Sequence, residues 1–182
     1  MKLRTIATAT LLALSLPAIA AQWTLADAMP ISGNSVDRIP SSRPAANINR
    51  PGFFSDLTFE HKSHTWFALS DRGPGGGTLP YETRVHRFAL DVDSATGGIS
   101  EFRILQTLIF RKGATALDGY APSEAGPLGL AFDPEGIVVH PLTGNLLLSD
   151  EYGPSVIEVN RAGQLVRRYS LPANVLPRNA AS

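Results

Sequence analysis

The chain lacks cysteine, and its most apolar run is too short to remain as a membrane-spanning anchor. Without disulfides, a buried core or a bound metal must hold the fold together. An excess of one charge is missing too, because 16 basic residues balance 16 acidic ones in a chain of 182. The basic residues are scattered, which argues against a nucleic-acid-binding surface.

The N-terminus has the three regions of a secretory signal peptide. Lys2 and Arg4 precede an apolar run over residues 6–16, and a small-residue pattern ends at Ala20 and Ala21. We therefore predict that residues 1–20 are the signal peptide of a bacterial periplasmic or secreted protein, which keeps no stable membrane anchor after cleavage. Removing Lys2 and Arg4 takes the 16 basic residues to 14 against 16 acidic ones, a net charge of −2.

Strand patterns fill most of the remaining chain. Residues 21–52 read as an irregular lead-in with at most a short strand over 36–39, and residues 111–127 are irregular because glycine and proline interrupt them. Apolar or alternating runs predict strands at 53–59, 65–69, 85–92, 99–110, 137–139, 146–148, 156–159 and 165–171. We expect no amphipathic helix between them.

These strands form two similar units. Residues 57–70 and 137–149 each contain an apolar strand, a polar turn and a second apolar strand that leads into Leu-Ser-Asp, and two further strands follow each of them. Repeated four-stranded units of about 40 residues are typical of a β-propeller. The predicted fold class is therefore all-β, with β-propeller-like four-stranded blades over residues 53–177.

The number of blades falls short of a closed ring. Closure takes roughly 4 to 8 blades, and the pattern indicates about two. We therefore expect an incomplete propeller, with residues 178–182 as a tail at an apparent truncation. Missing C-terminal blades or another chain would then be needed to cover the open sheet.

Carboxylates gather at the ends of one predicted hairpin, residues 132–154. Asp133 and Glu135 precede its first strand and Asp150 and Glu151 follow its second, so an antiparallel turn brings all four to one edge. Like charges this close repel unless a cation or a shared proton offsets them, which makes the edge a candidate site. The alternative is that some of these residues only cap turns through backbone hydrogen bonds.

Several motifs resemble those of one protein family. They are Leu-Ser-Asp-Arg-Gly at 69–73, Phe-Asp-Pro-Glu-Gly-Ile at 132–137, Ser-Asp-Glu-Tyr-Gly-Pro-Ser at 149–155 and Leu-Pro-Ala-Asn-Val-Leu-Pro at 171–177. Over residues 53–177 the chain resembles the phytase-like (esterase-like activity of phytase) domain family of secreted bacterial proteins. The resemblance implies a propeller-like β fold and phosphoester hydrolysis. Asp150 stands where that family usually has Glu, and Asp56 where it usually has Gly.

The resemblance and the acidic edge together predict a metal-dependent phosphoesterase, although this short chain could be inactive alone. Ca²⁺ binds carboxylate and carbonyl oxygens from loops, and the expected ligands are Asp71, Asp133, Glu135, Asp150 and Glu151. The expected catalytic residues are Asp150, Glu151 and Arg72. Arg72 is the natural bidentate partner of a small phosphorylated substrate.

Two other functions stay open. A lactonase or sugar-ester hydrolase of the gluconolactonase kind also places acids around a metal, and a non-catalytic propeller could use Ca²⁺ for stability while its face binds a partner. For the residues, the competing interpretation has Asp71 and Asp150 capping turns and Arg72 paired with Glu151.

Overall fold

A computed structural model describes residues 23–39, 51–52, 54–122, 129–169 and 171–175. Within these ranges the regular structure consists of ten strands and one short 3-10 helix, Ala173–Val175. No helix in this part of the chain has the length and apolar character that crossing a membrane requires. The predicted signal peptide, residues 1–20, and the predicted tail, residues 178–182, lie outside the described residues.

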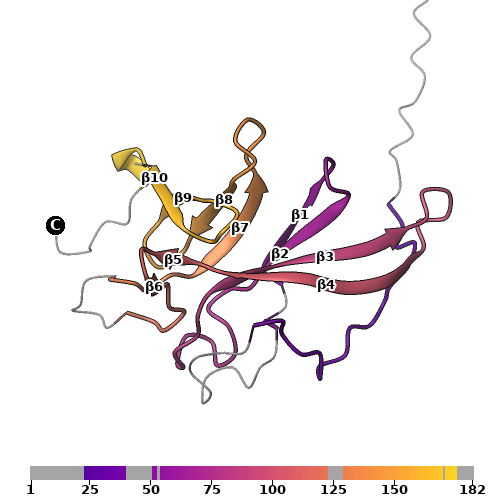
Figure 1. Ribbon diagram of the computed structural model, residues 1–182, viewed down its shortest axis with the longest axis horizontal. Coiled ribbons are helices and arrows are strands. Elements are labelled where there is room, and N and C mark those ends of the chain that lie inside the picture. Colours follow the sequence, from indigo (N-terminus) through magenta and orange to yellow (C-terminus); the bar gives the residue numbers. More distant parts are fainter. Residues whose placement is uncertain (1–22, 40–50, 53, 123–128, 170, 176–182) are drawn as a thin grey trace, which may run out of the picture.

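The first sheet contains four antiparallel strands in chain order (Figure 1). They are β1 (Asp56–Glu60), β2 (Thr65–Leu69), β3 (Arg84–Val92) and β4 (Ile99–Ile109). Aromatic and β-branched residues favour the extended backbone of β2. After β3, the Asp93 carboxylate accepts the N–H of Ala95 and Gly97 adopts φ 77°, so the chain reverses into β4. All four predicted strands of the first unit are confirmed.

The second sheet repeats this plan with β7 (Pro134–Val139), β8 (Leu146–Asp150), β9 (Ser155–Val159) and β10 (Leu165–Tyr169). His140 closes the β7–β8 turn, because its Nδ1 accepts the N–H groups of Leu142 and Thr143. Gly144 completes the turn at φ 72°. The predicted strands of the second unit are confirmed as well.

The core lies between the two sheets. Alternate positions of each strand turn toward the other sheet, which is why Phe67 and Leu69 in β2 and Leu146 and Leu148 in β8 are buried. The cluster comprises Phe67, Leu69, Val85, Leu108, Phe110, Leu117, Phe132, Ile137, Leu146, Leu148, Ile157 and Val159. Each fully buried large apolar side chain stabilises the fold by about 1.5–3 kcal/mol. Burial of this core therefore stabilises a fold that has no disulfides.

A side-chain hydrogen bond links the two sheets. Asp56 at the start of β1 accepts the N–H of Ile137 in β7 at 2.8 Å, which explains the carboxylate that departs from the family pattern.

Beyond β4, the short strands β5 (Arg111–Lys112) and β6 (Thr115–Ala116) pair within a stretch expected to be irregular. Strands of two residues carry no readable alternation, so this pair was not predicted.

Residues 23–39 of the lead-in run along the first sheet (Figure 1), and Arg38 donates from Nε to the carbonyl of Ile104 in β4 at 3.0 Å. The short strand expected at 36–39 is wrong. Asp37 turns the chain there, since its Oδ1 accepts the N–H of Ile39 at 3.0 Å and its Oδ2 lies 2.7 Å from Nη1 of Arg84. The contacts of the Asp37 side chain thus hold residues 36–39 in place without the backbone hydrogen bonds of a strand.

The described residues therefore form an all-β fold of two four-stranded antiparallel sheets, neither of them closed. The arrangement is consistent with an incomplete propeller-like fold, as the repeat predicted. In it, β1 and β7 are the strands at the shared edge of the two sheets, and the loops beside that edge carry the predicted site.

Candidate functional site

The β7–β8 hairpin brings its acidic residues to one edge. Pro134 pairs with Asp150 across the two strands, so Asp133 lies opposite the residues that follow β8. The backbone N–H of Glu151 donates to the carbonyl of Asp133 at 2.9 Å, which continues the pairing past the strand ends. The antiparallel geometry inferred from the sequence is the one the structure shows.

Three carboxylates form a compact group, called the acidic triplet below: Asp133, Glu135 and Glu151. One ligand oxygen from each lies within 4.8 Å of the other two. Asp133 is buried, whereas Glu135 and Glu151 are exposed. This group can offer a cation oxygen ligands from both ends of the hairpin, with one side open to solvent.

Arg72 reaches the acidic triplet from the first sheet. Its Nη1 lies 3.0 Å from Oδ2 of Asp133, and its backbone N–H donates to Oδ1 of the same carboxylate at 3.2 Å. The side chain of Arg72 is 36% exposed and that of Asp133 is 0% exposed. Within the described residues, then, Arg72 pairs with Asp133 and not with Glu151, contrary to the competing interpretation.

Burial raises the pKa of Asp133 to about 6. The guanidinium of Arg72 lowers this pKa, but Glu135, Asp71 and Glu151 each raise it by charge repulsion. Oδ2 of Asp133 accepts no hydrogen bond from the described residues, although Arg72 lies close, because the two groups are not aligned for one. A buried carboxylate oxygen in this state has capacity for a further positive partner.

The two remaining predicted ligands bind backbone groups. Asp71 accepts the N–H of Gly73 at 2.6 Å, which shapes the loop after β2. Asp150 is buried, and its Oδ1 accepts the N–H of Asp133 at 3.2 Å. Burial raises the pKa of Asp150, while backbone hydrogen bonds and Arg168 lower it. Neither residue belongs to the acidic triplet, and both instead hold the backbone next to it in place.

Tyr152 and Gly119 are parts of the site that the sequence analysis missed. The Tyr152 hydroxyl donates to the carbonyl of Gly119 at 3.1 Å, and the Arg72 guanidinium lies 6.0 Å from the centre of the Tyr152 ring. The hydrogen bond with Tyr152, followed by the charge of Asp133, raises the pKa of Arg72. A Cβ on Gly119 would lie 2.3 Å from the carbonyl oxygen of Arg72. In the sequence, the only indication that Tyr152 belongs to the site is its position next to Glu151.

Comparison with known proteins adds the family. A family model described as Phytase-like, esterase-like activity of phytase, matches residues 49–182. The chain belongs to the phytase-like family. This match confirms the resemblance carried by the motifs, and it starts in the lead-in a few residues before the first blade. No match was found among curated proteins or among solved structures.

Membership in the phytase-like family indicates an esterase-like or phosphatase-like hydrolase. The matched region contains both sheets, the acidic triplet and Arg72. The family therefore gives the class of reaction, and the chemistry of the site must be argued from its residues.

Proposed function

We propose that this protein is an exported, metal-dependent phosphoester hydrolase whose cation site is the acidic triplet. The observation that carries the proposal is the buried Asp133 carboxylate, which lies beside Arg72 and within 4.8 Å of two exposed carboxylates. A cation and a guanidinium on the same carboxylate provide two positive groups for one phosphate ester.

The residues present fit a hard divalent cation such as Ca²⁺. The acidic triplet consists only of oxygen donors, which Ca²⁺ prefers, and Asp133 has a buried oxygen to which none of the described residues donates a hydrogen bond. When bound, Ca²⁺ would supply charge neutralisation and polarisation of the phosphoryl group. Asp133, Glu135 and Glu151 would hold it, and loop carbonyls and water would complete its oxygen shell.

Arg72 and Glu151 are the residues proposed to act on the substrate. Arg72 is held by Asp133 and Tyr152 yet remains partly exposed, so its guanidinium can bind phosphoryl oxygens without reorganising. Glu151 is exposed beside it and can accept a proton from the attacking water. Asp150 is buried under the Asp133 backbone, and we assign it a positioning role.

Hydrolysis of a chromogenic phosphomonoester by the full-length protein tests the proposal. We expect Ca²⁺-dependent turnover, a decrease in kcat/KM of about 10²-fold or more in Glu151→Gln, and a similar decrease in Arg72→Gln. Glu101→Gln and Arg103→Gln are matched controls, because these residues form an exposed pair on β4. Absence of turnover at every Ca²⁺ concentration would contradict catalysis by this chain.

The non-catalytic alternative is favoured by turn-capping bonds, which Asp71 accepts from Gly73 and Asp150 accepts from the backbone of Tyr152 and Gly153. It is separated from the hydrolase by measuring thermal stability in the same samples. Both functions predict that Ca²⁺ raises the Tm through linkage and that Glu135→Ala abolishes the rise. A Tm rise without ester hydrolysis identifies a calcium-stabilised binding module, and turnover of an uncharged lactone alone identifies a gluconolactonase-like enzyme.

A further inference from the structure

A cleft lies at the end of these hairpins opposite to the acidic triplet. It has a volume of about 480 Å³ and is lined by Glu60, Lys62, Ser63, Phe67, Arg87, Gln106, Leu108, Thr143, Gly144 and Arg161. Glu60 ends β1, Lys62 lies in the β1–β2 turn and Gly144 in the β7–β8 turn, whereas the acidic triplet adjoins the other end of the β7–β8 hairpin. A five-residue strand spans roughly 16 Å, so the two sites are separate.

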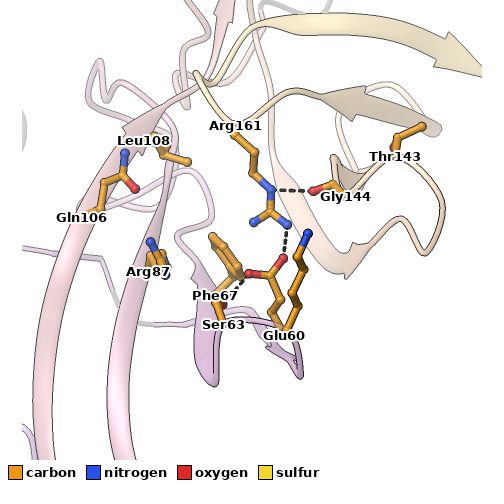
Figure 2. A pocket seen from close by; sticks show the side chains of 10 residues that line it. Glu60, Ser63, Phe67, Arg87, Gln106, Leu108, Thr143, Gly144 and Arg161 are labelled. Atoms are coloured by element: carbon orange, nitrogen blue, oxygen red, sulfur yellow. Dashed lines mark hydrogen bonds and ion pairs between the residues drawn. The ribbon is translucent and has the colours of Figure 1, made fainter.

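Arg161 joins the two sides of this cleft (Figure 2). Its Nε donates to the carbonyl of Gly144, and its Nη2 is ion-paired with Glu60. Its guanidinium carbon also lies 4.6 Å from the centre of the Phe67 ring. Three contacts of different kinds fix this cation in place, and an apolar ring beneath it strengthens its electrostatic interactions.

The cleft has an excess of positive charge. Arg87 uses its Nε to donate to the Thr65 hydroxyl at 3.0 Å, and its side chain lies across the cleft from Arg161 in Figure 2. Although burial raises the pKa of Glu60, its hydrogen bond with Ser63 and the charges of Arg161 and Arg87 lower it overall, so Glu60 is ionised. Three cations, with Lys62 as the third, face one carboxylate, which leaves two positive charges unmatched.

We propose that this cleft binds a phosphate-bearing anion. A phosphate monoester carries close to two negative charges at neutral pH and matches the excess, whereas a single carboxylate would leave one positive charge over. The Glu60–Arg161 pair fixes the walls, and Lys62 and Arg87 provide donors outside that pair. The cleft volume suits a small molecule. Nothing in this proposal depends on hydrolysis at the acidic triplet.

Nuclear magnetic resonance of the ¹⁵N-labelled full-length protein tests the site, with inorganic phosphate as the probe and no calcium present. We expect saturable shifts of the Ser63 and Gly144 amides. Lys62→Gln and Arg87→Gln should each raise the Kd roughly three- to tenfold, because each removes one charge-assisted contact. Lys112→Gln, at the exposed end of β5, and Arg72→Gln, at the acidic triplet, should leave the Kd unchanged.

Three outcomes would overturn the proposal. They are the absence of saturable shifts at these amides, an equal effect of Lys112→Gln and Lys62→Gln, and loss of binding in Arg72→Gln alone. Acetate provides a further check, since binding as tight as that of phosphate would contradict the charge match.

The source of the phosphate is resolved by two more titrations, with glycerol phosphate and with vesicles that contain phosphatidic acid, since both carry a phosphate monoester. Binding of glycerol phosphate with Lys62-dependent affinity supports a soluble phosphorylated ligand. Lys62-dependent binding of the vesicles that is tighter than binding of either soluble phosphate supports a lipid headgroup. If none of these probes binds, the site is disproved. Lys62→Gln alters the cleft and leaves Arg72 unchanged, so it should weaken phosphate binding in the cleft without affecting hydrolysis. Failure of one proposal can therefore be distinguished from failure of the other.

Discussion

Asp133 and Asp37 are two buried carboxylates whose surroundings act in opposite directions. Burial, together with repulsion by nearby acids, raises the pKa of Asp133 more than the single guanidinium of Arg72 lowers it. Burial also raises the pKa of Asp37, but a hydrogen bond from Thr107 and the charge of Arg84 contribute to an overall lowering. The charge of Asp133 is thus incompletely compensated, whereas that of Asp37 is compensated. Incomplete compensation is typical of a binding residue and full compensation of a structural one.

The state of Asp133 predicts a pH dependence of stability. Its folded pKa of about 6 lies above the ordinary value of 3.8, so its contribution to stability is fully present below about pH 4 and is lost as the pH rises through 6. Without calcium, the unfolding free energy of the wild type relative to Asp133→Asn should fall by at most about 3 kcal/mol between pH 4 and pH 7. Urea unfolding of both proteins across this range measures it.

Asp93→Asn is the control for this prediction. Asp93 is an exposed turn residue whose pKa is lowered by hydrogen bonds from Ala95 and Thr96. Its contribution to stability is therefore lost as the pH falls, the opposite direction to Asp133. A pH-independent difference between the wild type and Asp133→Asn would show that Asp133 titrates normally.

At the scale of elements, turns connect the two sheets as well as the strands within each. The β9–β10 turn places Gly163 against the end of β4, and the carbonyl of Gly163 accepts the N–H of Arg111 at 2.8 Å. Gly163 has φ 81°, and a Cβ there would lie 2.2 Å from the carbonyl oxygen of Ile109. This turn therefore has two reasons to require glycine.

Gly163→Ala should destabilise the protein by about 2–4 kcal/mol, from left-handed strain and from the clash with the β4 backbone. Gly113→Ala isolates the first of these costs, because Gly113 has φ 61° and a Cβ there would meet no described atom within 4 Å. We expect about 1–2 kcal/mol for that variant. Equal losses in the two variants, measured by urea unfolding, would mean that the contact with Ile109 is not important.

For the whole molecule, the lead-in is an integral part of the fold. Arg84 is fully buried in β3 and pairs with Asp37, whose Oδ1 also accepts the Thr107 hydroxyl at 2.6 Å. His86 extends this network, lying 3.1 Å from Thr107 through Nδ1 and 3.2 Å from the Ser70 hydroxyl through Nε2. A polar network thus attaches the lead-in to the first sheet.

Asp37→Ala should therefore cost about 3–5 kcal/mol of stability, because it removes the nearer of the two carboxylates paired with the buried Arg84 charge and leaves Glu82 at 3.9 Å. Asp27→Ala is the matched control in the lead-in. Asp27 is exposed and accepts only backbone N–H groups in the described residues, so we expect a much smaller loss of stability than in Asp37→Ala. Thermal unfolding of the two variants would contradict an integral lead-in if both lost equally little.

Much of the fold and part of the site follow from the sequence by itself. Alternating apolar residues and local turn signals are short-range properties, so they predicted both hairpin units and the edge where Asp133 and Glu151 meet. The motifs around these residues also predicted the phytase-like family. The two-residue strands β5 and β6 have no such signal and were missed.

The tertiary structure alone decided which distant side chains meet. Arg72 and Asp133 are 61 positions apart, Arg84 and Asp37 are 47 apart, and Arg161 and Glu60 are 101 apart. Pairing between side chains this far apart in the sequence depends on how the two sheets and the lead-in pack together, and no local pattern specifies it. The sequence therefore determined the strands, the repeat and the acidic edge, while packing of the sheets decided the partner of Arg72 and created the cationic cleft.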